Sequence, residues 1–170
     1  MTRYIQDAEG NRYTPDQYRA KHRHVHFVGW PSADYLASVG ASLVDAIEPA
    51  TTQDVNAERD RRIVAGFTFQ GVHYQSRPED RENIAGASTS ALGAMMNNAA
   101  PGDYRWHGEP SDFVWIASDN TEHPMDAQTM FSFGQAAMAH KQAHIFAARA
   151  LKDADPIPSD FALDSYWPTG

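Results

Sequence analysis

Three histidines at alternate positions near the N-terminus are the residues best spaced to bind a metal ion. His22, His24 and His26 fall in or beside residues 23–28, where apolar and polar side chains alternate as they do in a β-strand. Alternate residues of a strand point to the same face, so the three imidazoles would lie side by side and could chelate a transition metal. The alternative is an exposed polar face whose apolar side is turned toward the core. We adopt this alternative and predict no bound metal.

A second pair of histidines occurs one helical turn apart in the C-terminal half. His140 and His144 have the spacing that two-point metal binding on a helix uses. No third histidine and no carboxylate lies at a matching spacing nearby, and the adjoining Lys141 and Gln142 are typical of a solvated helix edge. The pair is therefore interpreted as part of an exposed face.

Sequence signatures of a nucleophile or of a phosphate-binding loop are absent. The chain has no cysteine, no Gly-x-Ser-x-Gly motif and no glycine-rich loop. Glu79, Asp80 and Glu82 could in principle supply a pair of catalytic carboxylates. They stand at the start of a predicted helix, however, where negative charge interacts favourably with the helix dipole. We predict no catalytic residue, no cofactor and no enzymatic activity.

Aromatic residues gather in one part of the second half and could form a platform on which a sugar ring stacks. They are Tyr104, Trp106, Phe113 and Trp115. Phe113 and Trp115 fall in a predicted buried strand, so core packing explains them better. Trp106 lies in a loop that carries Gly and Pro, and it is the ring that we expect to be exposed and available to a partner.

The overall charge and the absence of long apolar runs limit the classes of partner. The formal net charge is −8 at pH 7, which disfavours nucleic acid because binding to its backbone depends on clustered Lys and Arg. No run of about 18 apolar residues occurs, and the N-terminus lacks the apolar core of a signal peptide. We expect a soluble protein that neither binds nucleic acid nor inserts into a membrane.

The elements that position these residues fall into three segments. Residues 1–50 form a small N-terminal part, residues 51–155 the main domain, and residues 156–170 an extended arm that carries large aromatic rings. A linker with Pro and Thr over residues 46–53 joins the first two segments.

The N-terminal part is predicted to contain short strands and one short helix. Residues 3–6 and 11–13 form a hairpin, residues 23–28 a strand and residues 43–47 another strand. Ser32 caps a short helix that ends at Gly40.

The main domain begins with a helix, a hairpin and a second helix. Thr52 or Asp54 caps the first helix, which Gly66 ends. A hairpin follows over residues 67–74, with Gln70 and Gly71 at its turn. A capping box that begins at Ser76 then opens the second helix, which Asn97 and Asn98 close; the box places Pro78 in the first turn and Glu79 at its end.

A strand, a turn and a long helix complete the main domain. Phe113 to Ile116 form a strand with both faces covered, and Asp119 and Asn120 form a turn. Asp126 caps a helix that runs to about residue 153, and Met125 packs against Met130 as a hydrophobic staple. The predicted class is α+β: a small antiparallel sheet packed with two to three helices, a long C-terminal helix, and a small N-terminal part that contains β-structure.

Residues 54–153 resemble a domain of uncharacterised function that recurs in bacteriophage and prophage tail proteins. The match begins with Val55-Asn-x-Glu-Arg-Asp-Arg-Arg-Ile63 and Gly66-Phe-x-Phe-x-Gly-x-x-Tyr74, and it continues with Trp115-Ile-Ala-Ser-Asp-Asn120, Met125-Asp-Ala127 and Ala148-Arg-Ala-Leu-Lys152. The order and spacing of these motifs make the match specific. A further strand pair with glycine and tryptophan, expected between the two parts, is replaced here by the short linker.

This resemblance implies a non-enzymatic structural protein of the distal tail or tail fibre, made in the bacterial host cytoplasm and retained in the virion. Its partners would be other tail or tail-fibre proteins and further copies of itself, in a trimer or ring. One alternative is a fibre-assembly chaperone that is absent from mature virions, and another is a tail module that binds a carbohydrate receptor. The candidate partner-binding residues are Phe27, Trp30, Trp106, Phe161, Tyr166 and Trp167.

Overall fold

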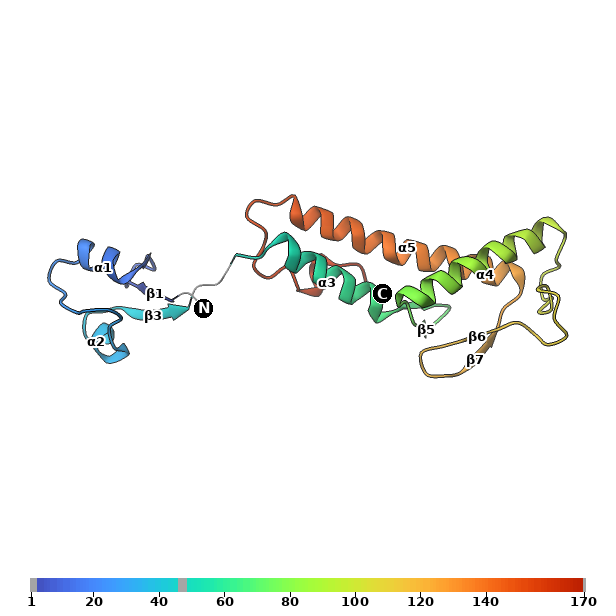
Figure 1. The fold of residues 1–170 in the computed structure, drawn as a ribbon, viewed down its shortest axis with the longest axis horizontal. Coiled ribbons are helices and arrows are strands. Elements are labelled where there is room, and N and C mark those ends of the chain that lie inside the picture. Colours follow the sequence, from blue (N-terminus) through green and yellow to red (C-terminus); the bar gives the residue numbers. More distant parts are fainter. Residues whose placement is uncertain (1–2, 46–48, 170) are drawn as a thin grey trace. The chain divides into compact units, whose positions relative to one another are not determined.

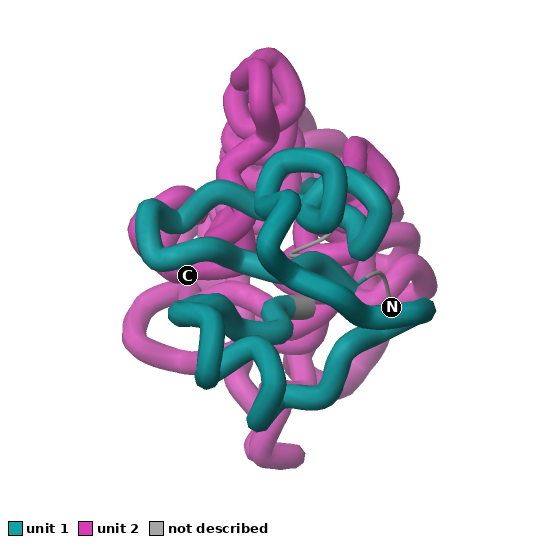
Figure 2. Tube along the Cα trace, turned by 90° about the vertical axis from the view of Figure 1, so that its left-hand side faces the viewer, with its two compact units in different colours: residues 1–49 teal, residues 50–170 magenta. Residues whose placement is uncertain are grey.

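A computed structural model describes residues 3–45 and 49–169 of the chain. The chain divides into two compact units, Met1–Pro49 and Ala50–Gly170, which Figure 2 colours separately. The division falls inside the predicted linker, next to the predicted boundary between residues 50 and 51.

Unit 1, Met1–Pro49, combines a three-stranded antiparallel sheet with two short helices. In chain order its elements are β1 (Arg3–Gln6), β2 (Arg12–Tyr13), α1 (Pro15–Lys21), α2 (Ala33–Ser38) and β3 (Ser42–Asp45). β1 is the central strand, because it pairs with β2 on one side and β3 on the other. Ile5, Tyr18 and Leu36 form the core where the sheet meets the helices. The predicted first hairpin and the helix capped by Ser32 are confirmed.

The turn between β1 and β2 is built around the carboxylate of Asp7. It accepts hydrogen bonds from the backbone N–H groups of Glu9 and Asn11, from the Asn11 side chain and from the Tyr13 hydroxyl. Burial by itself would raise the pKa of Asp7, but these hydrogen bonds, chiefly those from Asn11, lower the pKa to about 2. Asp7 is therefore ionised at neutral pH and ties the two strands together.

The predicted strand over residues 23–28 is wrong, because this stretch is a loop. Helix α1, which the sequence analysis missed, comes before it; Thr14 and Gln17 form its capping box. β1 already has a neighbour on each side, so no place beside it is left for a further strand. The loop instead buries the Val25 side chain, which is 4% exposed. Of the last predicted strand, over residues 43–47, the part up to Asp45 is confirmed as β3, and residues 46 and 47 lie outside the described residues.

Unit 2, Ala50–Gly170, places three helices beside two hairpins (Figure 1). In chain order its elements are α3 (Thr52–Ala65), β4 (Phe67–Phe69), β5 (Val72–Tyr74), α4 (Pro78–Met96), β6 (Val114–Ile116), β7 (Glu122–Pro124), α5 (Ala127–Lys152) and the 3₁₀-helix η1 (Asp164–Tyr166). The predicted α+β class with a long C-terminal helix is confirmed. The described strands of this unit pair as two separate two-stranded ribbons rather than as one small sheet.

Helix α3 begins after a capping residue and ends at a glycine. Thr51 is the N-cap, one residue before the predicted range: its hydroxyl accepts the Asp54 N–H and the Asp54 carboxylate accepts the Thr51 N–H. Gly66 ends the helix as predicted, with a φ of +106°. A Cβ at this position would lie 2.3 Å from the carbonyl oxygen of Tyr74, so only glycine lets β5 approach so closely.

The β4–β5 hairpin and helix α4 are present as predicted, but the N-cap of α4 is a different residue. Gln70 and Gly71 both have positive φ, which is the requirement of a two-residue turn with the twist of a hairpin. The N-cap of α4 is Arg77 and not the predicted Ser76, and the Asp80 carboxylate accepts the Arg77 N–H at 2.8 Å. Ser76 is instead fully buried next to the helix start.

The predicted strand of the Trp115 region exists, but only one of its faces is covered. Val114 and Ile116 of β6 are 36% and 54% exposed, whereas Trp115 packs against the core. The turn over Asp119 and Asn120 is confirmed, and Asn120 has a φ of +72°. The sequence analysis missed β7, with which β6 pairs to form a ribbon. A two-stranded ribbon on a helical layer has one free face, which explains the exposed side chains.

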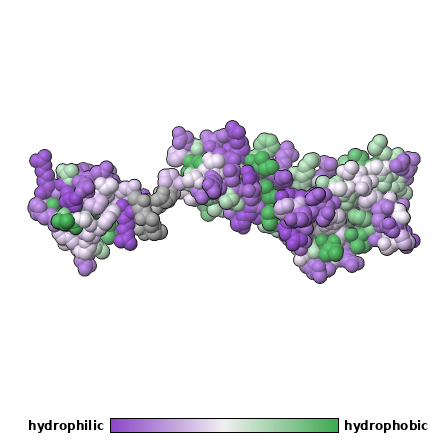
Figure 3. All heavy atoms as spheres, in the orientation of Figure 1, coloured by the Kyte–Doolittle hydropathy of each residue, from purple (hydrophilic) through white to green (hydrophobic). Residues whose placement is uncertain are grey.

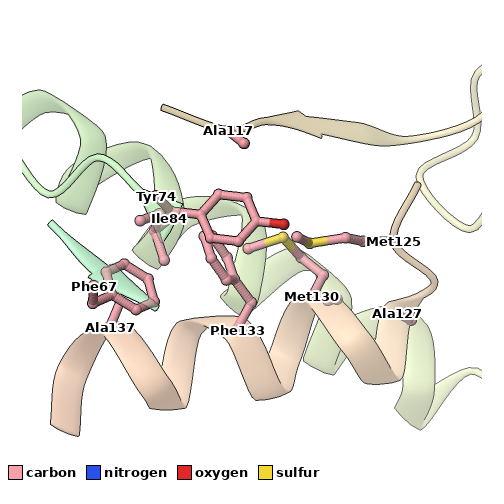
Figure 4. Packing of buried hydrophobic residues seen from close by; sticks show 10 residues of the cluster. Phe67, Tyr74, Ile84, Ala117, Met125, Ala127, Met130, Phe133 and Ala137 are labelled. Atoms are coloured by element: carbon pink, nitrogen blue, oxygen red, sulfur yellow. The ribbon is translucent and has the colours of Figure 1, made fainter. Parts of the chain in front are cut away.

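The core of unit 2 lies between α4, α5 and the two hairpins. Asp126 caps α5 as predicted, by accepting the Thr129 N–H at 2.8 Å, and Met125 and Met130 both lie in the core. Figure 4 shows Phe133 rising from α5 toward Tyr74, and the two ring centroids are 4.7 Å apart. These large side chains join the helices and the hairpins into one hydrophobic cluster.

The predicted extended arm over residues 156–170 is wrong, because its described part folds back on α3 and α5. Trp167 is 5% exposed and packs against Val55 of α3 and Leu151 of α5. Its indole N–H donates to the Phe161 carbonyl at 2.7 Å. Arg62 of α3 lies over the indole ring and donates to groups of the tail. The prolines of this segment indicated an extended chain, but burial of the Trp167 ring determines the course of the backbone.

Candidate docking surface

Within the described part of unit 2, the layer formed by α4 and α5 is covered on one side only. The buried residues of the two helices, among them Ile84, Ala91 and Phe133, belong to the cluster that the hairpins complete. Each helix has a second face, formed by residues three and four positions apart. This face carries the exposed side chains of Leu92, Met96 and Met138. We define the outer face by six residues of this kind, which are Ala85, Thr89, Leu92, Met96, Gln135 and Met138.

The outer face belongs to two helical stretches that contain no ionised side chain. No Asp, Glu, Lys or Arg occurs from Asn83 to Met96 or from Ala127 to His140. A helix face exposed to water normally carries such residues, because they keep it soluble. Met96 and Met138 are nevertheless 78% and 58% exposed. Pale and green residues are frequent along the right-hand part of the upper edge of unit 2 in Figure 3, where α4 lies in Figure 1. An exposed apolar patch of this kind is typical of an interaction surface.

A hollow of about 340 Å³ lies in the middle of the outer face, between the two helices. Its lining includes Ala85, Ser88 and Thr89 of α4 and Gly134 and Met138 of α5. A Cβ on Gly134 would lie 2.4 Å from the Cβ of Ser88, so the helices cross closely because this position is glycine. Arg81 of α4 and Lys141 of α5 also line the hollow, so it combines short uncharged side chains with two cationic ones.

Exposed apolar residues also occur farther along α5, past the part of this helix that lies beside α4. Ile145 and Phe146 are 42% and 62% exposed. Here the surroundings change, because Lys141 and Arg149 flank the two apolar residues. The Arg149 guanidinium pairs with Asp153 one turn later. The charged rim of the surface thus begins where the charge-free stretch of α5 ends.

The three N-terminal histidines do not share a face. The His22 ring stacks on Tyr18 at 4.2 Å, and His24 meets the edge of His22 with 6.0 Å between centroids. His26 is exposed, and its backbone N–H donates to the Tyr35 hydroxyl. Within residues 3–45 and 49–169 no three His, Cys, Asp or Glu side chains gather in a way that could hold a metal ion. The predicted strand, on which the three rings would have shared a face, is therefore wrong.

His144 is buried in unit 2 and His140 is half-buried, so the two do not form the predicted solvated edge. His144 is 3% exposed, its Nδ1 is 2.9 Å from the His140 carbonyl oxygen, and its ring stacks on Trp167. The His140 ring stacks on Phe67. Burial lowers the pKa of His140, and the neighbouring His144 lowers it further, so the neutral form is favoured. Lys141 and Gln142, which lie between the two histidines in the sequence, are exposed. Their polarity indicated wrongly that the histidines are exposed as well.

Of the three acids at the start of α4, Asp80 acts in capping. The Asp80 carboxylate accepts hydrogen bonds from the backbone and the side chain of Arg77. The hydrogen bond from the Arg77 side chain lowers the pKa of Asp80, with burial as a smaller opposing effect. Asp80 therefore stays charged at the positive end of the helix dipole, as the sequence indicates.

Trp106 is packed against the core and does not offer the exposed ring that was predicted. Its indole N–H donates to the Met125 carbonyl at 2.9 Å, and its ring lies 4.8 Å from that of Phe113. The ring thereby anchors the long loop before β6, which explains a tryptophan in that loop. Trp106, Phe113 and Trp115 pack against the core cluster, so a sugar ring could stack on them only if they left it. Tyr104, the fourth aromatic residue of the group, is 39% exposed.

The other predicted partner-binding aromatic residues differ widely in exposure. Trp30 is 49% exposed beside Val28, which is 99% exposed, so this loop of unit 1 remains a candidate contact. Phe27 is half-buried against Tyr35 and under Arg19. In the tail, Phe161 packs beside Trp167 in the same cluster, and Tyr166 is 37% exposed with its hydroxyl bonded to Asp160.

Sequence reasoning missed a polar hollow between the two hairpin turns. His73, Asp119 and His123 line it together with Thr121. The Thr121 hydroxyl donates to Asp119 and lies 2.9 Å from Nε2 of His123. His73 Nε2 lies 3.0 Å from the Ala65 carbonyl oxygen at the end of α3. These contacts fix the turns, and the pairing of β6 with the unpredicted β7 is what brings the residues together.

Comparison with known proteins places most of unit 2 in a described family. The family described as a domain of unknown function (DUF4376) matches residues 46–163. No curated protein matches the chain. No solved structure matches it either. Within the part of the chain that the structure describes, no helix is long and apolar enough to span a bilayer.

Proposed function

We propose that this chain, which belongs to the DUF4376 family of domains of unknown function, is a non-enzymatic structural component of a bacteriophage tail. It acts by holding neighbouring tail proteins through protein–protein contacts. The observation that carries the contact function is the outer face, where two adjacent helices expose methionine and leucine side chains without one ionised residue. The link to phage tails is supported by the sequence resemblance of residues 54–153.

The arrangement of unit 2 supports a scaffold better than an enzyme. Its tightly packed core rests on Phe133 and on the buried Tyr74, and helix caps at Thr51 and Asp126 define the helix starts. The hollow on the outer face is lined by small residues such as Ala85, Ser88 and Gly134, and also by Arg81 and Lys141. Such a surface can accept the side chains of a partner protein.

Unit 1 and the linker extend this proposal to a second contact. The exposed Val28 and Trp30 occupy one bend of unit 1, and tryptophan is frequent at the centre of protein interfaces. In this proposal the loop of unit 1 contacts one tail protein and the outer face of unit 2 contacts another chain. The protein would then join two neighbours in the tail or fibre.

The test of this function is quantitative mass spectrometry of particles purified from a phage that carries the gene. The proposal predicts peptides of this chain at a fixed ratio to a known tail protein, after density-gradient purification and after a high-salt wash. Its absence from particles that still contain the known tail proteins would contradict the proposal. That result would favour the alternative, a fibre-assembly chaperone that leaves the particle before it matures.

A further inference from the structure

We infer that the hollow between α4 and α5 binds a carboxylate of a neighbouring tail protein, namely an Asp or Glu side chain flanked by apolar residues. The carboxylate lies at the end of the hollow that Arg81 and Lys141 line, and its apolar neighbours lie along Ala85 and Met138. The inference rests on the proposed function, because it takes the partner to be a protein. It deepens that function by stating which chemistry the outer face recognises.

The two cations of the hollow lie at the same end of it. Helices α4 and α5 run antiparallel, and Ser88 meets Gly134 where they cross. Arg81 comes seven residues before Ser88, and Lys141 comes seven residues after Gly134. In antiparallel helices these two steps lead in the same direction, so both cationic side chains approach the hollow from one side.

Arg81 and Lys141 differ from the other cations of unit 2, because neither has a carboxylate partner. Each of the other six arginines of the unit forms an ion pair with an Asp or Glu. Among the described residues Arg81 donates only to the Ser76 carbonyl, and Lys141 forms neither a hydrogen bond nor an ion pair. Lys152, the remaining cation, donates to Asn56 at 2.9 Å. In a chain with 22 acids and 14 bases, two cations without a counterion beside one hollow indicate an anionic ligand.

The carboxylates that interact electrostatically with these two cations already have arginines of their own. Asp60 accepts two hydrogen bonds from Arg59, at 2.8 and 2.9 Å. Asp80 accepts from the Arg77 side chain at 2.8 Å. Neither acid is among the residues that line the hollow. Positive charge is therefore in excess at this end of the hollow, and a carboxylate from outside would balance it.

The rest of the surface favours a protein segment over a free inorganic anion. The hollow of about 340 Å³ is at the small end of the range of ligand pockets, so it takes a side chain. Ser88 and Gln135 offer further hydrogen-bond donors to a carboxylate. Leu92 and Met138 beside it are 41% and 58% exposed, and an inorganic anion would leave both uncovered. The anionic side chains that a protein supplies are Asp and Glu, and apolar residues next to the acid would cover Leu92 and Met138.

Titration of the full-length protein with two capped tripeptides, followed by nitrogen–proton NMR, tests the inference. The probes are acetyl-Leu-Glu-Leu-amide and acetyl-Leu-Gln-Leu-amide. The acidic peptide should shift the amide signals of Ser88 and Gly134, and it should bind about two- to fivefold more tightly than the neutral one, as expected for an ion pair near the surface. The net charge of −8 opposes any anionic peptide, so such a preference reports the local cations.

Lys141→Gln should abolish most of the preference for the acidic peptide. Its side chain is exposed and forms no hydrogen bond among the described residues, so the substitution should not disturb the fold. Arg105→Gln is the matched control, because Arg105 is also exposed but pairs with Asp112 away from the hollow. Thermal unfolding establishes that both variants fold. Equal binding of the two peptides to the wild type would overturn the inference, as would a preference that Lys141→Gln leaves intact.

Two further arms decide what carries the carboxylate. Hexanoate, a free aliphatic acid, should bind more weakly than the acidic peptide, and tighter binding of hexanoate would reject a protein partner in favour of a free amphiphile. In purified particles a water-soluble carbodiimide joins amines to carboxylates that touch them. It should link Lys141 to an Asp or Glu of another tail protein, whereas a link from Lys141 to a second copy of this chain would overturn the choice of partner.

The two proposals fail in distinguishable ways. A preference for the acidic peptide, in a protein missing from purified particles, would uphold the carboxylate site and reject the role in the virion. A chain that is present in particles but binds both peptides equally would reject the site and uphold the structural function.

Discussion

Trp167 shows how much of unit 2 depends on one side chain near the end of the chain. It is the buried member of the tail, and it contacts α3 through Val55, α5 through Leu151 and the ring of His144. The guanidinium of Arg62 covers its other side, with the Cζ atom 5.2 Å from the ring centre. Trp167 is therefore the most deeply buried ring that holds the tail, and Phe161 packs beside it in the same cluster.

Removal of this anchor should destabilise unit 2 strongly. Trp167→Ala leaves a cavity among α3, α5 and the tail, and the free energy of unfolding should fall by about 3 kcal/mol or more. Urea unfolding followed by circular dichroism measures the change. Leu163→Ala is the control, because Leu163 is 55% exposed, and its effect should stay within about 0.5 kcal/mol. Equal stability of the two variants would show that the tail does not pack as described.

His140 should make the stability of unit 2 depend on pH below neutrality. Burial lowers the pKa of His140 from its ordinary 6.5, so the folded protein resists a proton that the unfolded chain accepts. Nothing is lost above about pH 7, where both states are neutral, and stability falls as the pH drops through 6.5 toward the lowered value. The melting temperature should decrease less between pH 7.5 and 5.5 in His140→Gln than in the wild type. Parallel decreases in both proteins would contradict this assignment.

At the scale of elements, the close crossing of α4 and α5 is the feature that shapes the outer face. It depends on Gly134, where an added Cβ would lie 2.3 Å from the Ser88 hydroxyl and 2.4 Å from the Ser88 Cβ. Because the second atom is attached directly to the backbone of α4, a rotation of Ser88 cannot relieve the clash. The helices would have to separate, and the hollow between them would change with them.

Gly134→Ala should therefore destabilise unit 2 although alanine is the better helix former. The overpacking should lower the free energy of unfolding by roughly 1–3 kcal/mol, as measured by urea titration. The control is Gly86→Ala on α4, where no atom lies within 4 Å of an added Cβ. That change should be neutral or stabilising by up to about 1 kcal/mol. A gain in stability from Gly134→Ala would mean that the two helices do not cross so closely.

Elements with local signals could be predicted from the sequence, and those set by distant contacts could not. Asp126, Gly66 and the pair Gln70 and Gly71 act on their own backbone, so the α5 cap, the end of α3 and the first hairpin were predicted correctly. Strand β7 has no local pattern and exists because β6 lies beside it. The loop over residues 23–28 alternates like a strand, but it joins none of the described strands and instead buries the Val25 side chain.

The outer face could not be predicted from the sequence, for a related reason. The predicted contacts were aromatic residues, but Trp106 is half-buried against the core and Trp167 is buried. The outer face contains no aromatic residue among its six defining positions. A signal was present, namely two helical stretches without Asp, Glu, Lys or Arg, but it gains meaning only when packing shows which faces remain in solvent.

At the scale of the whole molecule, charge and apolar surface are segregated. Acids exceed bases by 22 to 14 along the chain, yet none of either kind occurs in the charge-free stretches of α4 and α5. The excess negative charge elsewhere keeps such a protein in solution while one uncharged face remains free for contact. The DUF4376 match covers this face, so the same property can be sought in other members of the family.

The central claim is that the outer face of unit 2 holds the chain in a phage tail, and incorporation into particles tests it most directly. Phages that encode Met138→Glu or Ile116→Glu would be compared by quantitative mass spectrometry of purified particles, with the cellular level of each variant measured in the same lysates. The account predicts that Met138→Glu is depleted from particles at an equal cellular level, whereas Ile116→Glu is incorporated like the wild type. Equal incorporation of Met138→Glu and the wild type would contradict it.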